Sequence, residues 1–550
     1  MAALFKVITL LLISIVLATS ALLVPAHIRS VDASVVELAG ARARSVEDKI
    51  WEAVNAAHVG PAQRYMQATH SRHTAQQAHI RQLLQTNPDF AISGGPNHHF
   101  EALLKQSLRR HSSDTVIPQL LPRSERAALA ATLIASHNRN VVALLQIRHL
   151  SGLMRLHPAS HPAGAPYDAG VLTLALLIES GQFQPAFAQQ IGNLAILAAG
   201  NQPQAILACE DLIIDTLSLG RLLDYCSLGS LAQLTTARSD WSQMAALFRA
   251  QPNRIAELYT ALRFSEAPAV LYTYLAEHPA VGDRDLNFAL CHGPGAVSYL
   301  IHSKQTIYRA NSSAATILNA LAPYRPESFT VLTLRHHSLG LMLKFSLLFC
   351  AGLAFALAMG SAWRHSLGNI DTVSRSNPAV MMRDVLISFV VLITLWTLFE
   401  PEVLKSRESV ANTGPRIEFA VADALQSLKS PIKTMQELNQ VTLLVVVLFL
   451  IVQLVIYCFC LIKIKEVVKQ SLSATMKLKL LDNEDNLFDF GLYVGLGGTV
   501  LSLILVAVGV VEASLMAAYA STLFGIIFTA ILKVLHLRPY RRQLILEAGA

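Results

Sequence analysis

The chain contains 550 residues, of which 53% are hydrophobic and 15% are charged, and its formal net charge is +7. This composition is typical of an integral membrane protein that also carries a large soluble part. The basic residues neither cluster on one face nor alternate with aromatic residues, which excludes a nucleic-acid-binding surface. Six apolar segments have the length of membrane spans, so we expect an all-α, six-span integral membrane protein.

The first predicted span covers residues 7–26. It follows Lys6 and contains 20 residues, enough for a helix to cross the hydrocarbon core of a bilayer. Its length and its single N-terminal lysine indicate an uncleaved signal anchor, whereas residues 18–21 also suit a cleavage site. We expect the anchor to be retained.

Residues 27–337 form a predicted exported domain between the first and second spans. Apolar residues recur there at spacings of three and four, and Gly- and Pro-rich breakers separate the helices. Over 165–305 the pattern suggests helix pairs stacked as an α-solenoid, although no fixed repeat length is present. Long polar helices are expected over 34–57 and 61–84, the first with Ser34 as its N-cap in a capping box.

The exported domain contains no catalytic motif, so we do not expect an enzyme. Five histidines between residues 70 and 99 invite a zinc interpretation. No cysteine or paired carboxylate completes a ligand set, and solvated histidines on a polar helix are the simpler hypothesis. Cys209 and Cys226 either form a disulfide in an oxidising compartment or, with Cys291, are buried thiols. We expect no metal and no cofactor.

The second, third and fourth predicted spans cover residues 340–363, 385–404 and 438–462. Lys344 lies near one end of the second span, where its long stem can reach the membrane surface. The third span is the weakest, because Glu400 and Glu402 shorten its uncharged part.

The last apolar block lies between Asp489 and Lys533. Its 43 residues contain one charge, Glu512, and are long enough for two membrane helices but too long for one. We therefore predict a hairpin that turns at residues 509–512 and supplies the fifth and sixth spans.

The distribution of Lys and Arg predicts that both termini are cytoplasmic. With Lys6 inside, the basic stretches 363–384, 463–488 and 533–550 also lie inside, and the basic residues of the loop after the third span are the exception. In a bacterium this topology means a multi-pass protein of the inner membrane, in contact with the lipid bilayer, with a periplasmic domain. The predicted segments are 1–26, 27–337, 338–404, 405–437, 438–537 and 538–550.

Both helices of the predicted hairpin carry small and hydroxyl-bearing residues at helical spacing, where a purely lipid-facing anchor needs only Leu, Ile and Val. The pattern indicates either a packed helix interface or a pathway for ions. The candidate pathway residues are Thr499, Ser502, Glu512, Ser521 and Thr522. The candidate packing residues are Gly491, Gly495, Gly498, Ala518 and Gly525.

Two short motifs in the hairpin resemble the MotA/TolQ/ExbB proton channel family. The first is Gly495-Leu496-Gly497-Gly498-Thr499-Val500, and the second is Ser521-Thr522-Leu523-Phe524-Gly525-Ile526. The resemblance covers about residues 385–537 and does not extend to the exported domain. Two features depart from the family: the stretch 463–488 is much shorter than its inner domain, and the shorter turn places Glu512 further from Thr522.

The resemblance implies a ring of subunits with Thr499 and Thr522 on the channel face and Glu512 near the outer mouth. It also implies a homo-oligomer around a separate single-span membrane protein whose Asp takes the proton. We expect an energy-transducing or transport-coupled subunit whose periplasmic domain contacts a partner that the sequence does not identify. The alternative is a non-conducting membrane-anchored scaffold or sensor, in which the small residues only pack helices and Glu512 is a hydrated turn residue.

Overall fold

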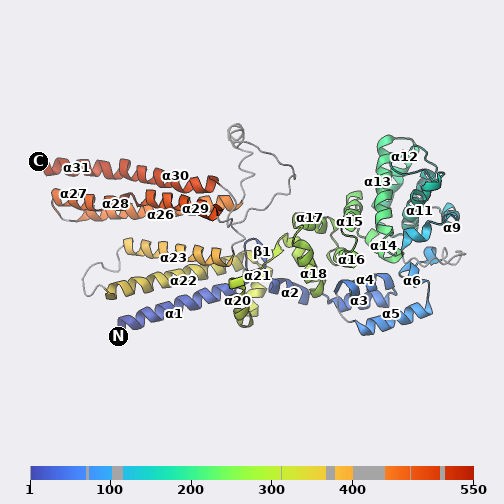
Figure 1. Cartoon of the computed structure of the whole chain (residues 1–550), viewed down its shortest axis with the longest axis horizontal. Coiled ribbons are helices and arrows are strands. Elements are labelled where there is room, and N and C mark those ends of the chain that lie inside the picture. Colours follow the sequence, from blue (N-terminus) through green and yellow to red (C-terminus); the bar gives the residue numbers. More distant parts are fainter. Residues whose placement is uncertain are drawn as a thin grey trace. The chain divides into compact units, whose positions relative to one another are not determined.

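The computed structural model describes residues 2–69, 73–101, 115–310, 312–366, 378–400, 440–470, 472–507 and 515–549. In this part the chain is helical apart from two short strands, which confirms the all-α expectation (Figure 1). The chain divides into two compact units, Ser30–Tyr308 and the combination of Met1–Arg29 with Arg309–Ala550. The first unit is shorter at both ends than the exported domain predicted over 27–337.

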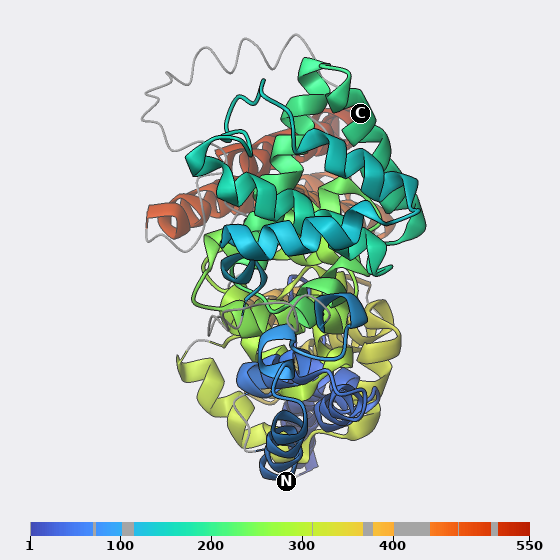
Figure 2. The same cartoon turned by 90° about the vertical axis from the view of Figure 1, so that its right-hand side faces the viewer.

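The unit Ser30–Tyr308 is built from helices of moderate length joined by short turns (Figures 1 and 2). Its helices are α2 (Ala33–Ala41), α3 (Val46–Asn55), α4 (Val59–Thr69), α5 (Thr74–Thr86), α6 (Phe90–Ser93), α8 (Val116–Leu120), α9 (Arg123–Ile134), α10 (Arg139–Ile147), η1 (Pro162–Gly164), α11 (Ala165–Glu179), α12 (Pro185–Ala199), α13 (Pro203–Gly220), α14 (Tyr225–Ala232), α15 (Arg238–Ala250), α16 (Ile255–Ser265), α17 (Pro268–Glu277), α18 (Gly282–His292) and α19 (Pro294–Ser303).

The two ends of this unit meet. Strand β1 (Ser30–Val31) pairs in parallel with β2 (Thr306–Ile307). Helix α2 packs against α19, and α4 packs against α16. These contacts join helices before residue 70 to helices after residue 254, so the unit closes on itself. The α-solenoid expected over 165–305 is not tested by them, because α2 and α4 lie outside that range.

The first helices of the unit are shorter than the sequence pattern predicts. Asp32, not Ser34, is the N-cap of α2, because its carboxylate accepts the Ser34 backbone N–H at 2.9 Å. The expected single helix then ends and restarts at α3, where Ser45 and Asp48 form a capping box. Ala57, whose backbone adopts the left-handed conformation (φ 59°), separates α3 from α4.

The core of this unit contains large aromatic side chains that are almost completely buried. Trp241 donates its indole N–H to the Thr216 hydroxyl at 3.1 Å, and Tyr167 donates to the Ile147 carbonyl at 2.7 Å. Each buried aromatic side chain contributes about 1.5–3 kcal/mol of hydrophobic stabilisation, provided that its polar atom finds a partner as it does here. Cys209 and Cys226 are free thiols, so the disulfide alternative does not apply.

The second unit begins with α1 (Ala2–Leu23) and resumes after the first unit. Its other elements are α20 (Ser312–Leu321), η2 (Ala322–Tyr324), α21 (Glu327–Arg335), α22 (His337–Ser366), α23 (Pro378–Phe399), α26 (Gln440–Lys469), α27 (Ala474–Asn483), α28 (Asp485–Phe488), α29 (Phe490–Ala507), α30 (Leu515–Ile531), the π-helical segment η4 (Leu532–Leu537) and α31 (Arg538–Gly549).

Three helical stretches of the described residues are long and apolar enough to cross a membrane. They are Leu4–Leu23, His337–Ala362 and Tyr519–Ala548. This confirms membrane-capable helices but falls short of the six spans expected. Helices α23, α26 and α29 occupy the positions of the third, fourth and fifth predicted spans, while the predicted turn at 509–512 and the loop 405–437 lie outside the described residues.

Helices α1, α22 and α23 pack together. The Ser14 hydroxyl on α1 donates to the Ala351 carbonyl on α22 at 2.8 Å. At the next residue of α22, a Cβ at Gly352 would lie 2.7 Å from the Ser388 carbonyl oxygen, so α23 approaches α22 closely at this glycine. Such small-residue contacts are typical of membrane helix pairs.

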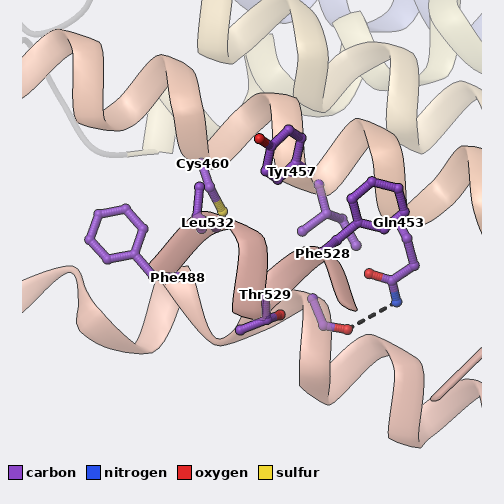
Figure 3. A pocket seen from close by; sticks show the side chains of 9 residues that line it. Gln453, Tyr457, Cys460, Phe488, Phe528, Thr529 and Leu532 are labelled. Carbon is purple, nitrogen blue, oxygen red and sulfur yellow. Dashed lines mark hydrogen bonds between the residues drawn. The ribbon is translucent and has the colours of Figure 1, made fainter. Parts of the chain in front are cut away.

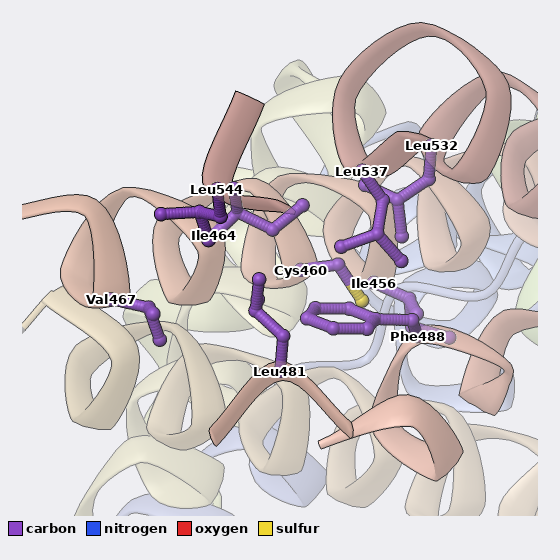
Figure 4. Close-up of a cluster of buried hydrophobic side chains, with 9 residues drawn as sticks. All are labelled: Ile456, Cys460, Ile464, Val467, Leu481, Phe488, Leu532, Leu537 and Leu544. Carbon is purple, nitrogen blue, oxygen red and sulfur yellow. The ribbon is translucent and has the colours of Figure 1, made fainter. Parts of the chain in front are cut away.

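Helices α26 to α31 share a second apolar core in the same unit (Figure 4). Its buried side chains are Ile456, Cys460, Ile464, Val467, Leu481, Phe488, Leu532, Leu537 and Leu544. The basic stretch after the fourth predicted span is therefore helical and packs against α31. The segment predicted as a tail at 538–550 is described through residue 549 and belongs to this bundle.

Candidate functional site

Helices α29 and α30 form the antiparallel pair that the apolar block predicts. The two charged residues that bound the block, Asp489 and Lys533, form an ion pair with 2.7 Å between the Lys533 Nζ and an Asp489 carboxylate oxygen. Because these residues lie at opposite ends of the block, their pairing shows that its two ends lie side by side.

Glycines at the α29–α30 contact allow the two backbones to touch. A Cβ at Gly525 would lie 2.8 Å from the Gly491 carbonyl oxygen and 3.3 Å from the Gly495 Cα, and a Cβ at Gly498 would lie 2.4 Å from the Ser521 hydroxyl. A methyl group at these positions needs a shift of the neighbouring helix. Gly497 differs, because a Cβ there meets nothing within 4 Å.

Three hydroxyl groups converge on one carbonyl beside this glycine contact. Thr499 and Ser521 each donate to the Gly495 carbonyl oxygen at 3.1 Å, and Thr522 lies 3.4 Å from the same oxygen. The Thr499 and Thr522 hydroxyls also hydrogen-bond to each other. Thr499 and Ser521 are buried, whereas Thr522 is half-buried. The structure thus brings together three of the five candidate pathway residues.

The other candidates are only partly described. Ser502 and Ala518 lie within helices α29 and α30, but their side chains fall outside the described part of the structure, and so does the whole of Glu512. Nothing structural therefore bears on the role of Glu512. The outer face of the hairpin is apolar and exposed at Leu496, Val500, Leu523 and Ile526, which suits contact with lipid or with another subunit.

A third helix contributes a polar group that sequence analysis missed. Gln453 of α26 is 1% exposed, and its side-chain amide donates to the Gly491 carbonyl oxygen at 2.9 Å. The same amide nitrogen lies 3.4 Å from the positions that a Cβ would occupy at Gly495 and at Gly525. Gln453 is the single polar residue in an otherwise apolar stretch of α26, and this was the sequence signal that could have identified it as part of the site.

A buried charge cluster, formed by Lys344 of α22 with residues that follow the ends of α1 and α23, was also missed. The Lys344 ammonium group contacts a Glu400 carboxylate oxygen at 2.5 Å and the Ala26 carbonyl oxygen at 2.7 Å. The His27 Nδ1 lies 2.9 Å from the same carboxylate oxygen, and Trp396 donates its indole N–H to the other one at 3.2 Å. Lys344 and Glu400 are each 4% exposed.

Lys344, expected to extend its stem to the membrane surface, instead has its ammonium group paired within this cluster. The ammonium group stays inside the bundle because a carboxylate and a carbonyl satisfy it there, which removes the need to reach water. One lysine and one glutamate in consecutive predicted spans were the signal, since an ionisable residue in a membrane helix usually has a partner.

Among the residues that the structure describes, no group of three or more His, Cys, Asp or Glu is placed to hold a metal ion. His73 hydrogen-bonds Thr69, and the His79 ring packs edge-on against Trp51. His70 lies outside the described residues.

Comparison with known proteins adds no relative: no family model, no characterised protein and no solved structure matches this chain.

Proposed function

We propose that the protein is a ring-forming, channel-type subunit of the bacterial inner membrane that couples ion flow to work outside the membrane. The observation that carries this proposal is the paired hydroxyls of Thr499 and Thr522, set against the Gly495 carbonyl in an apolar helix pair. Both threonines lie in the motifs that resemble the MotA/TolQ/ExbB family. The proposal includes six spans, cytoplasmic termini and a periplasmic helical unit.

The chemistry of the α29–α30 pair supports this proposal. A proton that crosses a membrane needs hydroxyls, water or carboxylates along its path, because hydrocarbon offers no hydrogen-bond partner. Thr522 is half-buried, so part of its surface faces away from the hairpin. In a ring of subunits that surface would face a single-span partner whose Asp takes the proton, and the exposed outer leucines and isoleucines would face neighbouring subunits or lipid.

A second candidate function is a non-conducting scaffold or sensor anchored in the membrane. It is favoured by one specific observation: the three hydroxyls hydrogen-bond within the hairpin, to Gly495 and between the two threonines. Such bonds also arise where small residues only pack two helices. In this function the unit Ser30–Tyr308 would present a binding surface to a periplasmic partner, with no ion flow.

Replacement of Thr499 and Thr522 with Ala in the native host separates the two functions. The channel proposal predicts that each variant, expressed at the wild-type level, no longer supports the phenotype that the wild-type protein gives its host. Each variant should also lose the proton leak that depends on the protein. Thr394→Ala is the matched control, since the hydroxyl of the exposed Thr394 donates to the Val390 carbonyl within its own helix. Wild-type behaviour of both variants would eliminate conduction and leave the scaffold.

Oligomeric state and partner provide an independent test. Crosslinking in the membrane should capture a homo-oligomer, and a short single-span protein with an Asp in its span should co-purify with it. Purely monomeric material in the membrane would contradict the ring.

A further inference from the structure

A small cavity lies between α26, α28, α29 and the end of α30. It is lined by Gln453, Ile456, Tyr457, Cys460, Phe488, Gly491, Phe528, Thr529 and Leu532, and its volume is about 10 Å³ (Figure 3). This volume is at the lower limit for one water molecule, and far too small for an organic ligand. Its lining presents both polar and apolar atoms, and the polar atoms decide what it holds.

The orientation of the Gln453 amide is determined by its neighbour. Its nitrogen donates to the Gly491 carbonyl oxygen at 2.9 Å, the bond drawn as a dashed line in Figure 3. The opposite orientation would place oxygen against oxygen, so the Oε1 atom must point elsewhere. Oε1 is buried and has no hydrogen-bond partner among the residues that the structure describes. A buried hydrogen-bond acceptor without a donor is energetically unfavourable, so Oε1 is expected to accept a hydrogen bond from a bound molecule.

A second oxygen faces the same point in the cavity. The position that a Cβ would occupy at Gly491 lies 3.2 Å from Gln453 Oε1 and 3.0 Å from the Thr529 hydroxyl oxygen. That position lies one covalent bond length from the Gly491 Cα, so a water cannot occupy it, but the distances show that both oxygens lie on the side of Gly491 that carries no side chain. One water beside this position can therefore reach an acceptor from α26 and a hydroxyl from α30.

We propose that this cavity binds one water molecule, held by the Gln453 side-chain oxygen and the Thr529 hydroxyl above Gly491. Two oxygens are too few for a metal cation, whereas a buried water typically makes two to four hydrogen bonds. The water would link α26 to α30 through polar contacts inside the apolar bundle. The inference does not depend on ion conduction, because it follows from the local geometry in one chain.

Hydroxyl-radical labelling of the full chain in lipid nanodiscs, driven by a short X-ray pulse, tests the proposal. Radicals formed from a bound water modify the side chains in contact with it, and Cys460 and Phe488 line the cavity although each is only 1% exposed. We expect Phe488 to be labelled clearly above Phe248, which is 0% exposed in the other unit, and Cys460 clearly above Cys209, a buried thiol of that unit. Labelling of Phe488 no higher than that of Phe248, with Cys460 no higher than Cys209, would show a dry cavity and overturn the proposal.

Two substitutions identify the water ligands. Gly491→Ala fills the site and should reduce the labelling of Phe488 to the Phe248 level, whereas Gly497→Ala, whose Cβ meets nothing within 4 Å, should leave it unchanged. If Gly491→Ala fails to fold, Thr529→Val removes the hydroxyl at constant shape and should lower the labelling in the same way. Unchanged labelling in either folded variant at the site would contradict the assignment.

Discussion

Substitution of Lys344 by Met should strongly destabilise the helix bundle of α1, α22 and α23. The ammonium group and the Glu400 carboxylate lie 2.5 Å apart and are each 4% exposed, so removal of the lysine leaves a carboxylate buried without its principal counter-charge. Loss of one partner of a buried ion pair costs about 3–5 kcal/mol in the free energy of unfolding. His27, at 2.9 Å, still faces the carboxylate, so we expect the lower end of that range.

The assay is reversible unfolding of the purified full chain in micelles, with a double-mutant cycle. Addition of Glu400→Gln to Lys344→Met removes the orphaned charge, so the double variant should be about 1–3 kcal/mol more stable than the sum of the single effects predicts. Lys463→Met is the matched control, because its 3.1 Å pair with Glu466 is half-exposed and should contribute less than about 1 kcal/mol. The argument would be refuted if Lys344→Met lowered the free energy of unfolding no more than Lys463→Met does. It would also be refuted if the effects of Lys344→Met and Glu400→Gln were strictly additive.

Three further predictions concern packing, a buried carboxylate and a thiol. Gly525→Ala should destabilise the α29–α30 pair by about 1–3 kcal/mol in the same assay, because its Cβ would lie 2.8 Å from a backbone carbonyl, whereas Gly497→Ala should have little effect. Glu210→Ala should speed hydrogen exchange at the three consecutive backbone amides that donate to the buried carboxylate at 2.9–3.1 Å; unchanged exchange would show that the carboxylate does not hold this loop. Burial raises the pKa of the Cys209 thiol to about 12, so its contribution to stability is present below pH 9.0 and is lost as the pH rises towards 12. Iodoacetamide near neutral pH should therefore modify the exposed Cys291 and reach Cys209 only after unfolding, and equal rates in the folded protein would contradict the structure.

The hairpin was predictable because its signal is local. Hydrophobic length and bounding charges predict two helices from residues 490–532 alone, and small residues at helical spacing predict a close contact. The structure confirms the helices and shows Gly495 against Gly525. The three hydroxyls meet for the same reason, since each lies one turn from a glycine of this contact.

Contacts between distant helices were not predictable in the same way. Gln453 lies 38 residues before Gly491, and the Lys344 partner is 56 residues away, so neither pair leaves a periodic pattern in the sequence. The closure of the unit Ser30–Tyr308 was not predicted either, because helix periodicity describes one helix at a time. It carries no information that α2 will pack against α19 and close the unit.

Proton flux across native membrane vesicles tests the central proposal most directly, because such vesicles retain any partner protein. Vesicles from cells that produce the wild-type chain should dissipate an imposed pH gradient faster than vesicles that lack it. The Thr499→Ala/Thr522→Ala variant, at equal expression, should reduce that flux to the level without the protein, while Thr394→Ala keeps the wild-type rate. A double variant that conducts like wild type, or a wild-type chain that adds no flux, would contradict the account.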